Sequence, residues 1–138
     1  MKFDTSAETK EFIESVHMRV GARNQAVLGR AALFLALGEG LPEKYKVKDS
    51  KGVTLNDEQI LGDDLKEIVR AALNYRSDRS LDENGYRQEF RKFFEYGCSR
   101  LKEIWESSGF DQATFVSELL RLANVESSPI IATDTTSV

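Results

Sequence analysis

The chain has 138 residues with 19 Lys and Arg against 23 Asp and Glu, which gives a formal net charge of −4. This length fits one domain, and the mildly acidic charge argues against a histone-like or polybasic nucleic-acid binder. The single cysteine excludes an intrachain disulfide, and no apolar run is long enough for a membrane span or the core of a secretory signal, so we expect a cytoplasmic protein.

The first segment predicts a short strand followed by two helices. Residues 2–4 alternate polar and apolar side chains, and residues 5–8 have the spacing of a capping box. Apolar residues then recur at helical spacing up to Val20, and Gly21 can adopt the left-handed turn that ends a helix. A second apolar helix is predicted over residues 24–37. A strand and two helices joined this tightly resemble a ribbon-helix-helix unit, which usually needs a second copy to complete its core.

The middle of the chain predicts a break and then a third helix. Glycines and a proline in residues 38–42 end the second helix. Basic and apolar residues alternate over residues 44–48, residues 49–52 are typical of a turn, and residues 53–55 are again typical of extended chain. This pattern predicts either a small hairpin with a basic outer face or a long loop. An apolar stripe interrupted at Gly62 predicts a helix over residues 63–75.

The last part of the chain is also predicted to be helical. A long amphipathic helix over residues 85–107 has an aromatic-rich face, which we expect to form the core or a subunit interface rather than to stack bases. Gly97 in its middle costs about 1 kcal/mol relative to alanine but permits a close helix crossing. A final helix is predicted over residues 111–123. The expected fold class is all-α, a helical bundle with one domain over residues 1–125 and a flexible tail over 126–138.

Three arginines are candidates for phosphate contact or for structural pairing. Arg19 and Arg23 flank the tight turn between the first two helices, where they and the free amides of the second helix could hold a phosphate. The alternative is a solvated turn. Arg30 lies within an otherwise apolar helix, so we expect a structural or interface role, paired with a carboxylate, in preference to DNA contact. The carboxylates considered are those of Glu11, Asp63 and Asp64.

Four lysines lie in the segment that predicts a hairpin or loop, namely Lys44, Lys46, Lys48 and Lys51. In an extended conformation the first three share one face, which would form an edge able to follow DNA phosphates. The alternative is a charged edge whose role is to prevent aggregation. Residues 1–51 carry nine cationic against seven acidic side chains, so any attraction for phosphate is expected in this half of the chain.

The sequence identifies no catalytic or metal site. His17 is the only histidine, and Cys98 has no histidine at a readable spacing, so structural roles are expected for both. The acidic pairs lie near predicted helix starts, where capping explains them. No Gly-x-x-x-x-Gly-Lys-Ser/Thr phosphate loop occurs. We therefore expect no metal and no cofactor, and favour a non-catalytic protein over a nicking enzyme.

Three segments, in order, resemble those of a known family. Residues 20–22 form a turn before the helix that contains Leu28-Gly29-Arg30-Ala31-Ala32-Leu33, and residues 52–64 hold Gly-Val-Thr-Leu-Asn followed by Leu-Gly-Asp-Asp. Phe90 and Gly97 are then separated by six residues on the way to Leu101. Together these segments resemble the DndE family, small helical proteins of the bacterial DNA phosphorothioation system, which replaces a non-bridging phosphate oxygen with sulfur.

The resemblance implies a helical protomer that assembles into a tetramer and binds duplex DNA with a preference for nicks. It also implies that the protein acts together with an ATPase subunit and a sulfur-transfer subunit, and that it carries no metal or cofactor. The chain departs from the family at Val20 and Gly29, where the family usually has threonine and cysteine. Where the family has a run of basic residues near the first turn, this chain has only Arg19 and Arg23.

We therefore expect a non-catalytic DNA-binding accessory subunit, in which several copies gather weakly basic turns on one surface. The main alternative is an oligomeric scaffold that contacts the ATPase and sulfur-transfer subunits and never touches DNA. A ribbon-helix-helix regulator would read an operator with an N-terminal strand, for which residues 1–5 are very short.

Overall fold

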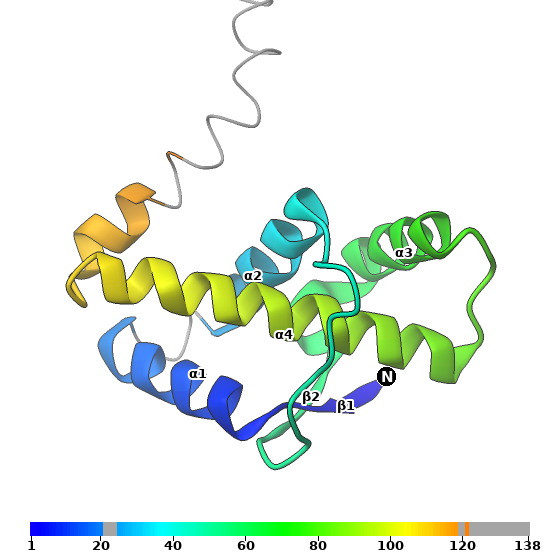
Figure 1. Cartoon of the computed structure of the whole chain (residues 1–138), viewed down its shortest axis with the longest axis horizontal. Coiled ribbons are helices and arrows are strands. Elements are labelled where there is room, and N and C mark those ends of the chain that lie inside the picture. The colour runs from blue at the N-terminus through cyan, green and yellow to red at the C-terminus, as the bar shows by residue number, and fades with distance from the viewer. Residues whose placement is uncertain (21–24, 119–120, 122–138) are drawn as a thin grey trace, which may run out of the picture. The chain divides into compact units, whose positions relative to one another are not determined.

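The computed structural model describes residues 1–20, 25–118 and 121 (Figure 1). These residues fall into two units, Met1–Lys102 and a second that begins at Glu103. Among the described residues, no helix combines the length and the hydropathy that crossing a membrane requires. The mostly helical fold class expected from the sequence is confirmed. The elements follow in the order β1 (Lys2–Asp4), α1 (Ala7–Val20), α2 (Gln25–Glu39), β2 (Thr54–Asn56), α3 (Asp57–Ser77) and α4 (Glu83–Ser107).

The two strands form one small antiparallel sheet. β1 pairs with β2 so that Phe3 lies opposite Leu55. The predicted N-terminal strand is therefore confirmed. The alternative of a small hairpin within residues 44–55 is wrong, because residues 45–49 form no strand and β2 finds its partner at the start of the chain.

α3 begins earlier than the sequence predicts. The side chain of Asn56 caps it by accepting a hydrogen bond from the Glu58 amide at 3.0 Å. Gly62 then leaves helical geometry with φ 73° and ψ 173°, which kinks the element. The helix predicted over residues 63–75 is present, but a short capped turn precedes it on the other side of Gly62.

The aromatic face of α4 forms the core, as predicted. Phe3 from β1 packs edge-to-face on Phe90 and Phe94, with ring centroids 5.0 and 5.2 Å apart. Tyr86 continues the cluster at 5.8 Å from Phe90, and all four side chains are buried. Because each aromatic ring buries a large apolar area, this cluster holds the sheet against α4.

α1 begins at a buried carboxylate supplied by α4. Glu95 accepts hydrogen bonds from the Ser6 amide, from the Ser6 hydroxyl at 3.2 Å and from the Thr9 hydroxyl. The Ser6 hydroxyl in turn accepts from the Thr9 amide at 3.1 Å. The capping box predicted at residues 5–8 is therefore wrong: Ser6 caps the helix, and its own amide is satisfied by Glu95 instead of by a side chain of the first turn. Thr5 serves another partner, since its hydroxyl accepts from the Val53 amide at 2.9 Å.

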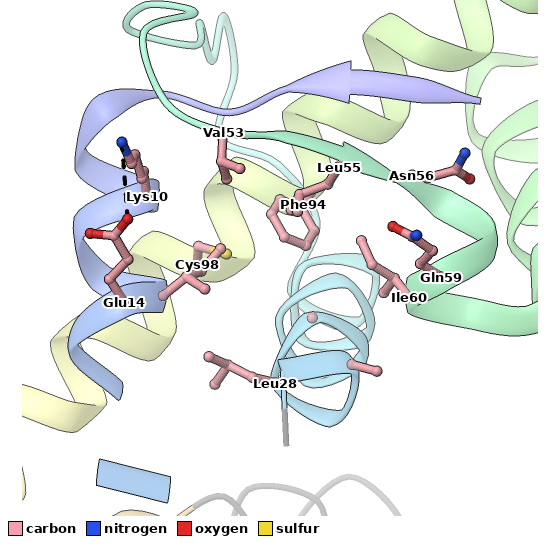
Figure 2. Close-up of a pocket in the computed structure, with 13 residues that line it drawn as sticks. Lys10, Glu14, Leu28, Val53, Leu55, Asn56, Gln59, Ile60, Phe94 and Cys98 are labelled. Atoms are coloured by element: carbon pink, nitrogen blue, oxygen red, sulfur yellow. Dashed lines mark ion pairs between the residues drawn. The ribbon is translucent and has the colours of Figure 1, made fainter. Parts of the chain in front are cut away.

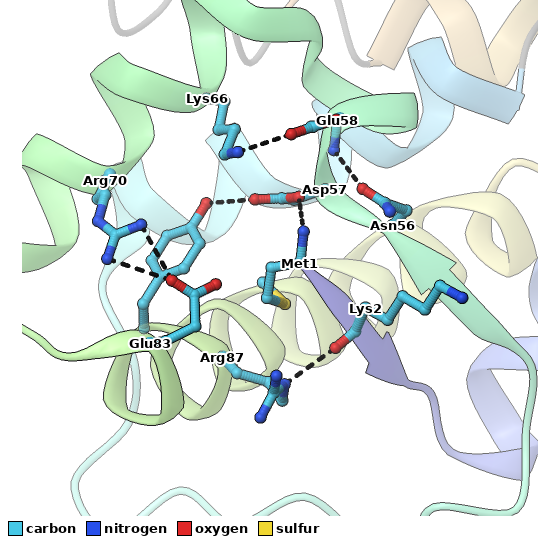
Figure 3. Close-up of polar contacts among 10 residues, drawn as sticks. Met1, Lys2, Asn56, Asp57, Glu58, Lys66, Arg70, Glu83 and Arg87 are labelled. Atoms are coloured by element: carbon cyan, nitrogen blue, oxygen red, sulfur yellow. Dashed lines mark hydrogen bonds and ion pairs between the residues drawn. The ribbon is translucent and has the colours of Figure 1, made fainter.

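A second buried carboxylate joins the sheet to α3 and α4 (Figure 3). Asp57 receives the α-amino group of Met1 on Oδ1 at 2.8 Å and the hydroxyl of Tyr86 on Oδ2 at 2.8 Å. Burial and this hydrogen bond raise the pKa of Tyr86, so its hydroxyl remains a donor. Arg70 lies over the ring of Tyr86, with its guanidinium carbon 4.7 Å from the centroid.

The second unit has an aromatic cluster of its own. Trp105 packs edge-to-face on Phe110 and Phe115, with centroids 5.9 and 5.1 Å apart. Residues 112–118 are helical, which confirms that part of the last predicted helix. The Thr114 amide donates to the Asp111 side chain at 2.9 Å and so caps this helix. The predicted tail, residues 126–138, lies outside the described residues.

Gly97 brings α4 against α2, which confirms the close crossing predicted from its mid-helix position. A Cβ at residue 97 would lie 1.8 Å from the carbonyl oxygen of Ala32 and 3.0 Å from its Cα. Both atoms belong to backbone, so they cannot give way as a flexible side chain would. Only glycine fits this crossing.

Substitution Gly97→Ala should therefore destabilise the fold. In an unobstructed helix this change stabilises by about 1 kcal/mol, whereas overpacking costs about 1–3 kcal/mol or more. We expect the second effect to prevail, seen as a lower midpoint in thermal and urea unfolding. Ser99→Ala, at an exposed position two residues further along α4, should leave the midpoint unchanged. A Gly97→Ala protein as stable as the parent would contradict the close crossing.

Candidate nucleic-acid interface

Residues 43–51, which we call the crossing segment, pass over α4 without regular secondary structure (Figure 1). Tyr45 and Val47 are half-buried, and the ring of Tyr45 packs edge-to-face on Tyr96 of α4 at 5.6 Å. Between them, Lys46 is exposed, as are the lysines on either side. The predicted alternation of basic and apolar side chains is confirmed, although the segment is not a strand.

The crossing segment and α4 enclose a hollow of about 500 Å³, which we call the basic groove. Five of its eight lining residues are cationic. Two come from the crossing segment and three from the polar side of α4, namely Lys44, Lys46, Arg87, Arg91 and Lys92. The other three are Tyr45, Val47 and Gln88. None of these described lining residues is a carboxylate.

The cations of the groove are only partly compensated by acidic neighbours. Lys44 and Lys46 form no ion pair with any described residue. Arg87 donates from Nε to the carbonyl oxygen of Lys2 at 3.0 Å and has no ion pair with a carboxylate of the described residues (Figure 3). Lys92 contacts Glu89 at 3.3 Å within the same helix. Several positive charges facing one hollow favour the binding of an anion.

Arg91 attaches the crossing segment to α4. Its Nη2 donates to the carbonyl oxygen of Asp49 and, at 2.9 Å, to the hydroxyl of Ser50. The Asp49 carboxylate accepts from the amides of Lys51 and Ala7, and these bonds hold the pKa of Asp49 below its usual value. The Nε of Arg91 is buried and has no hydrogen-bond partner among the described residues. Arg91 is thus both a wall of the groove and its structural anchor.

The predicted phosphate-contacting lysines separate into two groups. Lys44 and Lys46 line the basic groove. Lys48 does not, because its ammonium pairs with Glu8 at 2.5 Å on the other side of the segment. Lys51 is exposed near the end of the segment and is not part of the groove wall.

Of the three predicted arginines, only Arg30 has a described side chain, and it does not line the groove. The side chain of Arg19 and the whole of Arg23 lie outside the described residues. Arg30 donates from Nη1 to the carbonyl oxygen of Ile60 at 3.0 Å, and none of the three carboxylates considered as its partner pairs with it in the described structure. Ile60 lies two residues before the kink at Gly62, where the helical hydrogen-bond path is interrupted and a carbonyl is open to a side-chain donor.

Sequence reasoning missed the three cations that α4 supplies. Arg87 and Arg91 are four residues apart and therefore share one face of the helix, with Lys92 beside them. This spacing was a usable signal. On an amphipathic helix, however, the same pattern is typical of a solvated polar face, and nothing local marks the segment that crosses it.

A second hollow, of about 540 Å³, lies beneath β2 (Figure 2). Its wall is mainly apolar, with Leu55, Phe94 and Cys98 pointing toward it, and the Lys10–Glu14 pair lies at one side. Burial raises the pKa of the Cys98 thiol well above its ordinary value, so the sulfur is protonated and a poor nucleophile. No group of metal-binding side chains occurs in the described part of the chain. This hollow can hold an apolar group.

Comparison with known proteins adds one finding. Residues 2–108 match the model of the family described as DNA sulphur modification protein DndE. No curated protein and no solved structure matches the chain. The matched residues include both strands, the four helices α1 to α4 and all of the basic groove.

The anchoring role of Arg91 predicts the behaviour of Arg91→Lys. This change keeps the positive charge but removes the planar group that reaches Asp49 and Ser50 together. Backbone amides of the crossing segment should exchange hydrogen for deuterium faster, while those of α2 and α3 stay protected. Lys92→Arg, one residue along, should leave the exchange unchanged. Equal protection in parent and Arg91→Lys would show that the segment is held by other contacts.

Proposed function

Because the chain belongs to the DndE family of DNA sulphur modification proteins, we propose that it is a non-catalytic subunit that binds duplex DNA, with a preference for nicked duplex. Family membership makes it a component of a DNA sulfur modification system. The proposal adds the role of that component: to hold DNA for a phosphorothioation reaction carried out by an ATPase subunit and a sulfur-transfer subunit.

The observation that carries the proposal is the basic groove. DNA binding depends mainly on cationic side chains that replace counterions at the phosphates. Although the chain has a net charge of −4, five cations from two separate elements meet at one hollow, and Lys44 and Lys46 have no acidic partner among the described residues. An acidic protein can therefore present a locally positive surface.

We further propose that the protein acts as a homo-oligomer, most simply a tetramer. Ile68 and Tyr75 on α3 are 59% and 87% exposed, and they are seven residues apart, which places them on one face of the helix. Val27 and Phe34 on α2 are also exposed large apolar side chains. Apolar surface of this kind supports contact between copies. Several grooves in one particle would then raise DNA affinity without a strongly basic subunit.

The alternative of a scaffold without DNA contact rests on the same exposed apolar side chains, which could instead meet the partner subunits. The regulator alternative has less support. The central residue of β1, Phe3, is 2% exposed, and β2 occupies the strand's edge, so few β1 side chains remain to read an operator.

The double substitution Lys44→Gln with Lys46→Gln should weaken binding to nicked duplex. If each lysine contacts one phosphate, the slope of log K against log salt becomes shallower by about 2, since each contact contributes about 0.9. Fluorescence anisotropy between about 50 and 200 mM salt measures this slope. Folding should be unaffected, because both side chains are exposed.

The matched control is Lys10→Gln with Arg79→Gln, which removes the same charge away from the groove. It should retain the parent slope. Equal losses in the two double variants would point to net charge rather than the groove. Failure of the parent to bind any duplex at low salt would favour the scaffold.

The proposed assembly predicts the effect of Ile68→Lys with Tyr75→Lys. Two charges on the exposed apolar face should shift sedimentation velocity from the oligomer to a smaller species, while the thermal midpoint changes little. Val116→Lys places a lysine at an exposed apolar position of the second unit and should leave the oligomer intact. A parent that sediments as a monomer at micromolar concentration would end the assembly proposal.

A further inference from the structure

On the side of the crossing segment away from Arg87 and Lys92 lies a smaller hollow, of about 100 Å³, where one carboxylate holds two lysines. Glu8 of α1 contacts Lys48 of the crossing segment through Oε2 at 2.5 Å. Its other oxygen, Oε1, contacts Lys102 of α4 at 3.2 Å. We call this arrangement the Glu8 bridge.

The Glu8 bridge adjoins the basic groove. Tyr45, Lys46 and Val47 line both hollows, so the two are separated only by the width of the crossing segment. Lys46 therefore lies between the cations of the groove and the two lysines of the bridge. A polyanion that follows the groove over the segment would next meet Lys48 and Lys102.

The bridge is open to solvent. The side chain of Lys48 is 73% exposed, and those of Glu8 and Lys102 are 36% and 37% exposed. Ion pairs at such positions are weak, because water screens them and ordering two long side chains has an entropic cost. An incoming anion can therefore compete for these ammonium groups.

Glu8 and Lys48 are both charged at neutral pH. Hydrogen bonds from Lys48 and Lys102 lower the pKa of the Glu8 carboxyl, and the bond to Glu8 raises the pKa of Lys48. Lys48 and Lys102 bring two positive charges to Glu8, while the buried Glu95 carboxylate lines the same hollow and Asp49 also acts on Lys48. A phosphate oxygen offers lysine the same kind of charged acceptor as a carboxylate oxygen does.

We propose that Glu8 is an internal substitute for a DNA phosphate. It holds Lys48 and Lys102 next to the basic groove, and a nucleic-acid backbone bound in the groove displaces the carboxylate and takes both lysines as additional contacts. The proposal rests on the proposed function, since the occupant is the DNA of that function. Glu8 thereby lowers the affinity of the surface for polyanions.

The test compares Glu8→Gln with Glu58→Gln. Each change removes one negative charge from an exposed carboxylate that pairs with lysine, but Glu58 pairs with Lys66 at 2.8 Å and lines neither hollow (Figure 3). Anisotropy with labelled nicked duplex should show tighter binding for Glu8→Gln than for Glu58→Gln. Its slope of log K against log salt should stay close to that of the parent, because both lysines reach phosphate in either complex and only the cost of displacing Glu8 is removed.

A second variant tests whether the tighter binding of Glu8→Gln comes from the two released lysines or from a change in the fold. Adding Lys48→Gln and Lys102→Gln to Glu8→Gln should abolish the gain and make the slope shallower than that of the parent by up to about 2, because both lysine contacts are lost. A thermal midpoint for Glu8→Gln close to that of Glu58→Gln would show that the fold is kept. A gain that survives in the triple variant would overturn the role of these two lysines.

Elution from immobilised heparin provides a readout that needs no specific DNA binding. Glu8→Gln should elute at higher salt than Glu58→Gln. Equal elution, with equal DNA affinities, would overturn the inference even if the parent binds nicked duplex well. Conversely, a parent that fails to bind duplex while Glu8→Gln still elutes later would contradict the proposed function and leave the displacement of Glu8 supported.

Discussion

The contact between two helix backbones at Gly97 is the constraint on which the rest of the first unit depends. It places α4 directly against Ala32 of α2, with no side chain between them. The same stretch of α4 carries Phe90 and Phe94 under the sheet and Glu95 at the start of α1. A wider crossing would move all of these contacts together. The polar side of α4 is positioned by the same contact, so the basic groove depends on it as well.

The groove itself is formed by a segment that has no secondary structure of its own. Tyr45 packs on Tyr96, Arg91 binds the backbone of Asp49, and Gly52 lies so close to Ser6 that a Cβ there would be 2.2 Å from its carbonyl oxygen. Side chains and one close backbone approach therefore replace the hydrogen-bond ladder of a sheet. This explains how an acidic chain concentrates positive charge: the segment carries its lysines to the arginines of α4.

Local patterns predicted the helices well, because apolar spacing, caps and glycine breaks act within a few residues. They could not predict the partner of β2, since strands of three residues carry no signal for pairing with a distant segment. The lysines illustrate the same limit. Lys46 and Lys48 have the same local sequence pattern. Only the tertiary structure shows that Lys48 pairs with Glu8, whereas Lys46 lines the groove. Half of the groove was missed because Arg87, Arg91 and Lys92 resemble an ordinary solvated helix face.

Lys46 borders two hollows, whereas Lys44 borders only the basic groove and Lys48 only the Glu8 bridge. A substitution at Lys46 is therefore pleiotropic, because it alters both surfaces at once. A change at Lys44 or at Lys48 acts on one of these hollows and leaves the lining of the other in place.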